Sequence, residues 1–199
     1  MADNKVICAV GVSICVAITL LICLLISIGT VEPIEYGIVY NSLTKTVDSN
    51  TVYPGGWYLI GPINSFITFP ATLVNLDFAD FDGATNRPLV VKDNDGQEIR
   101  LSFSIQYKLQ EKKVGELYLK LQKGYETTFY TYIDSVVRKV VGDFDSTMFW
   151  SNRTLAGEML RKDIDKKLKA VYTDVNFLQI LNVQLADKRE QSLINTQVT

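Results

Sequence analysis

The sequence has no histidine, and its three cysteines all lie in one hydrophobic segment near the N-terminus. Without histidine the chain cannot hold a Ser-His triad, a histidine metal ligand or an imidazole general base. Because Cys8, Cys15 and Cys23 are confined to that segment, the rest of the chain has neither a disulfide framework nor a cysteine metal site. We therefore expect no metal and no cofactor.

An excess of positive charge is also lacking, since 20 basic residues stand against 22 acidic ones. A net charge of −2 gives no attraction to a phosphate backbone, so nucleic acid is not an expected partner. Walker, GxGxxG and GxSxG motifs are missing as well. The carboxylate pairs Asp80/Asp82 and Asp143/Asp145 are better explained by turns than by acid–base chemistry. The sequence thus argues against an enzyme.

What the sequence does contain is a stretch of 26 residues without charge, from Val6 to Val31, between Lys5 and Glu32. As a helix it would be roughly 39 Å long, against about 30 Å of bilayer hydrocarbon. Fourteen of residues 6–28 are Val, Ile or Leu, which favours insertion by roughly 4–8 kcal/mol. The run is longer than the core of a cleaved signal peptide, the alternative for this position. We expect a single transmembrane helix that anchors the chain in a lipid bilayer.

Small residues recur at every fourth position in this segment, at Ala9, Ser13 and Ala17. That spacing lets two membrane helices approach closely, although small residues are also common in such helices without a packing role. The side of the membrane stays open, because only Lys5 precedes the segment and Lys45 is the first positive residue after it. In the absence of a transit peptide, we favour a plasma or endomembrane location over the mitochondrial inner membrane.

Aromatic side chains follow the expected anchor closely, at Trp57, Tyr58, Phe66 and Phe69. Amphipathic rings are favoured at the membrane interface, so we expect some of the four to contact it, with ordinary core packing as the alternative. Further along, residues 152–154 match the acceptor sequence for N-glycosylation, Asn-x-Thr. A helix start with Ser151 as its cap explains this match better.

The hydrophobic pattern behind the anchor changes from strand to helix and back. Turn residues and apolar runs predict strands over 34–40, 57–60, 66–69 and 73–81. Strict alternation predicts a long strand over 98–109, joined to a strand over 89–91 by the turn at 93–96, which lacks the spacing of a calcium loop. Helical periodicity covers 114–123, 126–141 and 151–172, and 177–185 returns to strand. This order makes the fold α+β.

The order of these segments resembles the SPFH (band 7) superfamily of stomatin, prohibitin, flotillin and HflK/HflC. The resemblance rests on a series of short stretches spread over about 165 residues. They are Val31-Glu32-Pro33-Ile34-Glu35-Tyr36-Gly37-Ile38-Val39, Tyr53-Pro54-Gly55-Gly56-Trp57-Tyr58-Leu59-Ile60-Gly61-Pro62, Phe66-Ile67-Thr68-Phe69-Pro70, Ser104-Ile105-Gln106-Tyr107-Lys108-Leu109, Phe149-Trp150-Ser151-Asn152-Arg153, Leu181-Asn182-Val183-Gln184-Leu185 and Ile194-Asn195-Thr196-Gln197-Val198.

The resemblance implies an SPFH1 subdomain over 32–110 and an SPFH2 subdomain over 111–185, between a transmembrane anchor over 1–31 and the start of a coiled-coil helix over 186–199. It also implies an oligomeric scaffold whose rings or cages organise a membrane microdomain. The partners would be copies of this chain or paralogous SPFH subunits. A regulatory adaptor bound to a membrane protease, channel or respiratory complex is the alternative. Because the anchor contains no proline, a full crossing is favoured over a membrane hairpin.

Overall fold

The computed structural model describes residues 2–144 and 146–185 of the chain. The chain divides into two compact units, Met1–Ala71 and Thr72–Thr199. The predicted subdomain boundary at residue 110 lies inside the second unit, because the long strand that ends there pairs along its length with a strand near the end of that unit. The predicted start of a coiled coil over 186–199 lies outside the described residues.

The first unit begins with helix α1 (Ala2–Ile26), which ends five residues before the end of the uncharged stretch. Ser27 follows the helix, and its amide and its hydroxyl both donate to the carbonyl of Cys23 in the last turn, at 3.1 and 2.6 Å. The next residues form strand β1 (Ile28–Val31), so the prediction of a helix through Val31 is wrong for these four. Among the described residues, no helix meets the combined length and hydropathy needed to cross a membrane.

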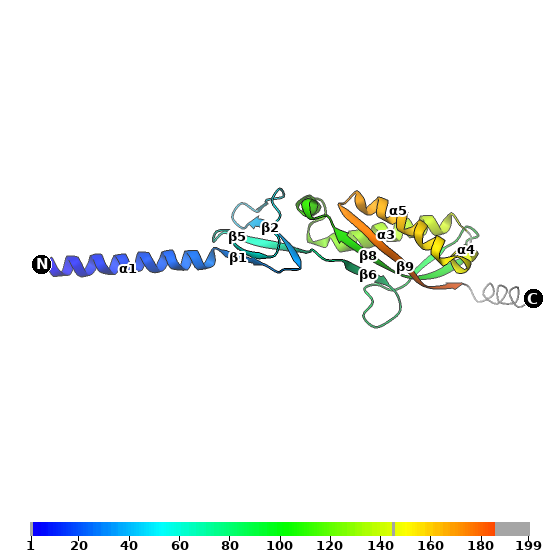
Figure 1. Ribbon diagram of the computed structural model, residues 1–199, viewed down its shortest axis with the longest axis horizontal. Helices are drawn as coiled ribbons and strands as arrows, with labels where there is room; N and C mark the ends of the chain where they lie inside the picture. The colour runs from blue at the N-terminus through cyan, green and yellow to red at the C-terminus, as the bar shows by residue number, and fades with distance from the viewer. Residues whose placement is uncertain (1, 145, 186–199) are drawn as a thin grey trace, which may run out of the picture. The chain divides into compact units, whose positions relative to one another are not determined.

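Two small antiparallel sheets complete the first unit (Figure 1). Strand β1 pairs with β4 in one sheet, and β2 lies between β3 and β5 in the other. Their bounds are β2 (Glu35–Asn41), β3 (Thr46–Val47), β4 (Gly56–Leu59) and β5 (Asn64–Pro70). The strands predicted over 34–40, 57–60 and 66–69 are confirmed with small shifts at their ends. The buried apolar side chains of this unit are Val31, Tyr36, Ile38, Ile67 and Phe69.

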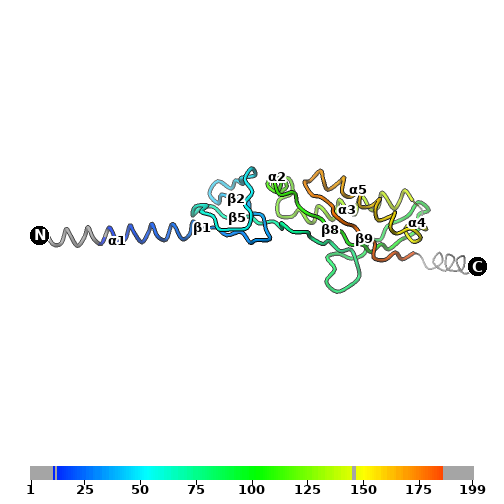
Figure 2. Tube along the Cα trace, in the orientation of Figure 1, coloured from blue at the N-terminus to red at the C-terminus, as the bar shows by residue number. Residues whose placement is uncertain are grey.

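The second unit contains a four-stranded antiparallel sheet built around strand β8 (Glu98–Leu109). Strands β6 (Val74–Phe78) and β7 (Leu89–Lys92) pair with one side of β8, and β9 (Thr173–Leu185) pairs with the other. Figure 2 shows the traces of β8 and β9 side by side. The alternation predicted over 98–109 is confirmed. Each apolar side chain of β8 is at most 1 % exposed: Ile99, Leu101, Phe103, Ile105, Tyr107 and Leu109.

Helices cover one face of this sheet (Figure 1). Their bounds are α2 (Val114–Leu121), α3 (Tyr125–Gly142), α4 (Ser146–Ser151) and α5 (Arg153–Lys169), with 3₁₀ turns at Glu111–Lys113 and Gln122–Gly124. Helices α3 and α5 bury one apolar stripe each, including Phe129 and Ile133 on α3 and Leu160 and Ile164 on α5, all 0 % exposed. The helix predicted over 114–123 corresponds to α2 and the second 3₁₀ turn, and that over 126–141 to α3.

The helix predicted over 151–172 corresponds to α5, and Ser151 is not its cap. Ser151 ends α4, and Asn152 caps α5 by accepting the backbone amide of Leu155 at 3.2 Å. Strand β9 begins at Thr173 rather than at residue 177, because Tyr172 in the left-handed region (φ 60°) reverses the chain immediately after α5. Of the four additional residues, Thr173, Asp174 and Val175 pair with the end of β8.

Candidate functional site

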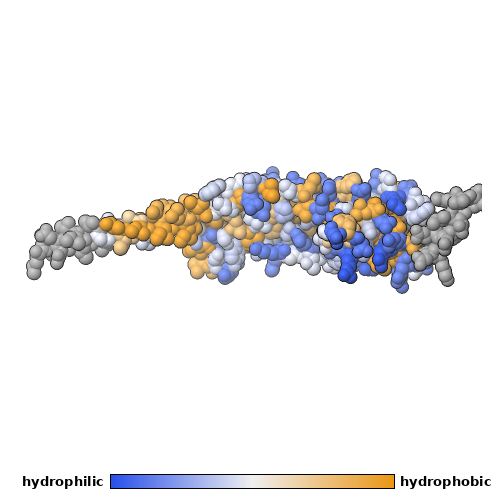
Figure 3. All heavy atoms as spheres, turned by 90° about the horizontal axis from the view of Figure 1, so that it is seen from below, coloured by the Kyte–Doolittle hydropathy of each residue, from blue (hydrophilic) through white to orange (hydrophobic). Residues whose placement is uncertain are grey.

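The strands β1 and β4 form a two-stranded ribbon directly after α1. Ile28 pairs with Leu59 and Thr30 pairs with Trp57, so these four side chains share one face of the ribbon. Trp57 is 80 % exposed, Leu59 70 % and Ile28 43 %. Figure 3 shows apolar side chains gathered along α1 and on the part of the unit that follows it. A contiguous exposed apolar surface of this kind marks a site of interaction with a protein or a membrane.

The opposite face of the ribbon is packed into the first unit. Val31 is 4 % exposed, and Tyr58 joins an aromatic cluster with Tyr53 and Phe66. The ring centroids lie 5.0 to 5.8 Å apart, and all three pairs have edge-to-face geometry, which suits the ring quadrupoles. The Tyr58 hydroxyl donates to the carbonyl of Pro54 at 2.9 Å. The ribbon is therefore amphipathic, with one face fixed in the unit and the other in solvent.

Two glycines allow the ring of Phe66 to lie this close to the backbone. A Cβ on Gly29 would meet the Phe66 ring at 2.8 Å and Ile60 Cδ1 at 2.6 Å. A Cβ on Gly37 would meet the same ring at 2.9 Å and Val31 Cγ2 at 2.6 Å. Carbon atoms normally approach to about 3.5–4.0 Å, so any larger residue at either position would displace the ring. The ring and the two glycines hold the ribbon in place.

The four aromatic residues predicted near the membrane interface have different surroundings. Trp57 is the one fully on the exposed face, whereas Tyr58 and Phe66 are half-buried in the aromatic cluster. Phe69 is only 2 % exposed, so core packing, the alternative given above, accounts for it. The sequence reasoning missed Ile28 and Leu59. The alternation within residues 57–59, with Trp and Leu on one face and Tyr on the other, could have identified Leu59.

Ala9, Ser13 and Ala17, the predicted packing positions, all lie in α1. Their four-residue spacing places them along one side of the helix. The side chains of Ser13 and Ala17 are exposed. Large apolar side chains around the helix are also exposed, each by about half or more of its surface: Ile14, Val16, Ile18, Leu20, Leu21, Ile22, Leu24, Leu25 and Ile26.

The carboxylate pairs do not form a reactive cluster in the described residues. Asp80 and Asp82 are exposed in the connection between β6 and β7, and Asp143 is exposed after α3. Asp145 lies outside the described residues. Across residues 2–144 and 146–185, no group of three His, Cys, Asp or Glu side chains is placed to hold a metal ion.

The turn between β7 and β8 uses its first aspartate to fix the backbone. Asp93 is 5 % exposed, and its Oδ1 accepts the amides of Asp95 at 3.1 Å and Gln97 at 2.8 Å. Gly96 occupies the left-handed region at φ 77°, which an L side chain adopts only with strain. This carboxylate oxygen therefore stabilises the turn, in agreement with the interpretation of residues 93–96 as a turn.

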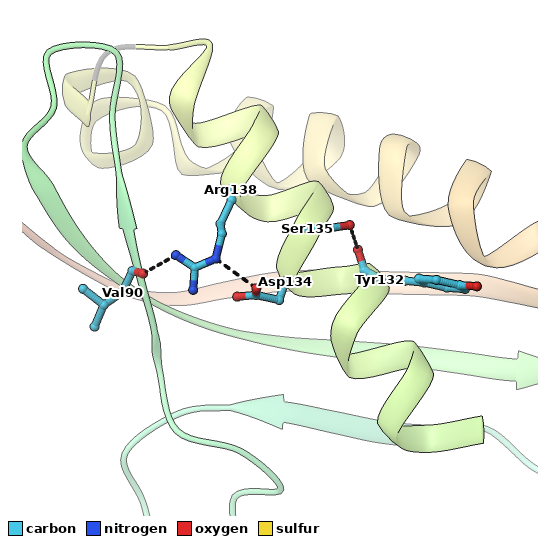
Figure 4. Close-up of polar contacts among 5 residues, drawn as sticks. All are labelled: Val90, Tyr132, Asp134, Ser135 and Arg138. Atoms are coloured by element: carbon cyan, nitrogen blue, oxygen red, sulfur yellow. Dashed lines mark hydrogen bonds and ion pairs between the residues drawn. The ribbon is translucent and has the colours of Figure 1, made fainter. Parts of the chain in front are cut away.

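Three further polar side chains in the second unit, those of Arg138, Tyr125 and Tyr107, are structural. Arg138 on α3 donates to the Asp134 carboxylate at 2.9 Å and to the carbonyl of Val90 at 3.0 Å, which ties the helix to β7 (Figure 4). Burial raises the pKa of Tyr125 to about 12, with Glu126 adding to the shift. Burial also raises the pKa of Tyr107. Both hydroxyls therefore stay protonated at neutral pH and cannot serve as bases.

The chain therefore has an α+β fold. The exposed apolar face of the ribbon, directly after the apolar helix α1, is a candidate surface for contact with a membrane. A family model described as SPFH domain / Band 7 family matches residues 30–199. The chain belongs to this family, and the resemblance inferred from the order of its segments is confirmed. No curated protein matches the chain closely enough to count as a relative.

Proposed function

We propose that the protein is a membrane-anchored scaffold of the SPFH/band 7 type, without catalytic activity, which works by self-association and lateral organisation of the bilayer. The family is commonly found in membrane scaffolds, and the observation that carries the proposal is the apolar face of the ribbon, with Trp57 80 % and Leu59 70 % exposed. Leaving such side chains in water is unfavourable by roughly 25 cal/mol per Å². A lipid interface removes that cost.

The anchor in this proposal is the uncharged stretch, most of which lies in α1 and which would cross the bilayer once, although the described part of α1 does not reach the length and hydropathy of a membrane span by itself. The 25 residues of α1 correspond to roughly 37 Å of helix, against about 30 Å of hydrocarbon. The polar Thr19 does not oppose insertion, since its hydroxyl donates to the carbonyl of Cys15 at 2.8 Å. The charged residues of α1, Asp3 and Lys5, are both in its first turn. Such a distribution suits a helix whose central part is in contact with lipid.

The ribbon then lies at the surface of the leaflet where α1 ends. Only Ser27 separates α1 from β1, and its carbonyl accepts the amides of Ile60 at 2.9 Å and Gly61 at 3.2 Å, just after β4. The C-terminal end of β4 is thus tied to the end of the helix. Trp57 would occupy the interface, where an indole ring is favoured because one edge is polar and the body is apolar.

Self-association is the second part of the proposal. Within the bilayer, the side of α1 formed by Ala9, Ser13 and Ala17 offers a surface of small side chains that a second anchor could approach. The partners would be further copies of the chain or paralogous SPFH subunits. The alternative is a regulatory adaptor. Such a protein would bind one larger membrane complex in fixed stoichiometry and would form no oligomer of its own.

The two tryptophans of the chain, Trp57 and Trp150, allow a direct test of the membrane contact. The full chain would be reconstituted in lipid that carries bromine in its acyl chains, as the variants Trp150→Phe and Trp57→Phe. We expect strong quenching where Trp57 is the reporter and little where Trp150 is. Equal quenching of the two reporters would contradict the membrane contact of the ribbon.

Self-association is tested by the mass of the particle extracted together with its surrounding lipid. We expect a particle that contains several copies of the chain. A single copy per particle at every protein-to-lipid ratio would overturn the scaffold proposal, and co-purification of one larger partner in fixed ratio would favour the adaptor.

A further inference from the structure

Strand β9 has one edge that no other described strand covers, although α5 reaches it near one end, where the Val175 amide donates to Asp165 Oδ1 at 3.0 Å. In the part of the chain that the structure describes, its 13 residues pair with β8 alone. A groove of about 480 Å³ opens beside this edge, between residues 176–180 of β9 and the first half of α5. Phe177 is 52 % and Leu181 39 % exposed on the strand. A long edge with unpaired backbone groups and exposed apolar side chains is a template for pairing with another strand.

The strand is nearly symmetric about Gln179 in both its burial and its sequence. Read outward from Gln179 in either direction, the order is buried, exposed, exposed, buried, not buried, buried. The residue types match as well over most of the strand. The equivalent pairs are Leu178 and Ile180, Phe177 and Leu181, Asn176 and Asn182, Val175 and Val183, Asp174 and Gln184, and Thr173 and Leu185.

The irregularities of the strand follow the same symmetry to within one residue. Its pairing with β8 shifts register twice, where Asn176 and Leu181 are extra residues without a partner across the ladder. These extra residues lie three positions before Gln179 and two positions after it, so rotation about Gln179 brings one β-bulge to within one residue of the other. A bulge usually protects an edge by disturbing its geometry. A symmetric partner would carry the same disturbance within one residue of the position that faces it.

From this symmetry we infer that β9 pairs with β9 of a second copy of the chain, antiparallel, around a two-fold axis that passes through Gln179. The inference names a surface for the self-association proposed above and rests on that proposal. An isologous interface needs a surface that is complementary to itself. Here each exposed Phe177 would face the partner's Leu181. Each residue on the buried face of β9 would face a buried residue of the partner strand. The two sheets would join into one.

A disulfide at the axis provides the test. In the full chain with Cys8, Cys15 and Cys23 replaced by Ala, the variant Gln179→Cys places two thiols opposite each other. Directly opposed residues of antiparallel strands have Cα atoms roughly 4.5–5.5 Å apart, within the range of a disulfide. We expect a covalent dimer on mild oxidation in lipid vesicles, reversed by dithiothreitol.

Gln184→Cys in the same background is the matched control, because Gln184 is an exposed glutamine on the same strand. Being five residues from the axis, its thiol would lie roughly 33 Å from its own copy, so we expect no covalent dimer. Mixing Gln184→Cys with Asp174→Cys should restore the cross-link, because these positions face each other in the inferred register.

The outcomes separate the inference from the function proposed above. Multi-copy particles without a cross-link at position 179 would overturn the β9 pairing and leave the scaffold intact. Equal cross-linking at 179 and 184 would also overturn it, since random encounter or another register would then explain the dimers. Single-copy particles would overturn both. A further variant, Phe177→Asp in the Gln179→Cys background, should abolish the cross-link while the particle keeps its fold.

Discussion

Replacing Gly37 by Ala tests whether the membrane-contact ribbon depends on the close packing around Phe66. The new Cβ would lie 2.6 Å from Val31 Cγ2 and 2.9 Å from the Phe66 ring, up to about 1 Å inside an ordinary carbon–carbon contact. The backbone of Gly37 cannot move aside, because it exchanges two hydrogen bonds with Tyr53 at 2.7 and 2.8 Å and pairs with Thr68. Overpacking of this kind costs about 1–3 kcal/mol.

The net effect should be smaller, because Ala is favoured over Gly in a strand by roughly 0.5–1 kcal/mol. A remaining loss of about 1–2 kcal/mol in the free energy of unfolding lowers the midpoint of a unit of this size by roughly 5–15 °C. Trp57 fluorescence in a Trp150→Phe background reports this unit during heating of the detergent-solubilised full chain. Gly124→Ala is the control, since a Cβ there meets no atom within 4 Å. A midpoint unchanged by Gly37→Ala would refute the reasoning.

Two further predictions concern α5. Asn152→Ala removes the oxygen that accepts the amide of Leu155 and should cost about 1 kcal/mol in urea unfolding, whereas Asn152→Asp should retain most of the stability. Burial acts to raise the pKa of Asp165, but hydrogen bonds from Lys169 and the Val175 amide outweigh it, and the pKa lies below its ordinary value of 3.8. The stability gained from this carboxylate is therefore present above pH 3.8 and lost as the pH falls through the lower pKa of the folded state. The stability difference between the parent and Asp165→Asn should shrink between pH 7 and pH 3, and a constant difference would contradict this role.

The sequence was sufficient wherever periodicity alone determines the structure. The long strand β8 was predicted to the residue, because its alternation runs without interruption between a turn and a helix. The helix boundaries around Gly124 followed from the same kind of pattern. In both cases the information is local, since each residue's burial is set by its neighbours a few positions away.

The errors arose where the structure depends on strand pairing between residues that are far apart in the sequence. The uncharged stretch gives no local sign that its last residues leave the helix, because β1 forms only by pairing with β4 almost thirty residues later. Likewise the early start of β9 depends on the end of β8. The exposed face of the ribbon was identified only through Trp57. Ile28 could not be assigned to the ribbon from the sequence, because a single sequence does not distinguish a membrane helix from an apolar strand that follows it.

The proposed anchor also bears on how strong the pairing through β9 must be. A single pair of strands with two β-bulges offers few contacts, and association in free solution would have to overcome the full loss of translational and rotational freedom. Chains held in one bilayer by α1 have already lost part of that freedom, and their effective concentration rises accordingly. A weak, self-complementary edge then suffices in the membrane without causing aggregation elsewhere. It follows that the yield of the cross-link at position 179 should depend on the protein-to-lipid ratio and hardly at all on the total volume of the sample.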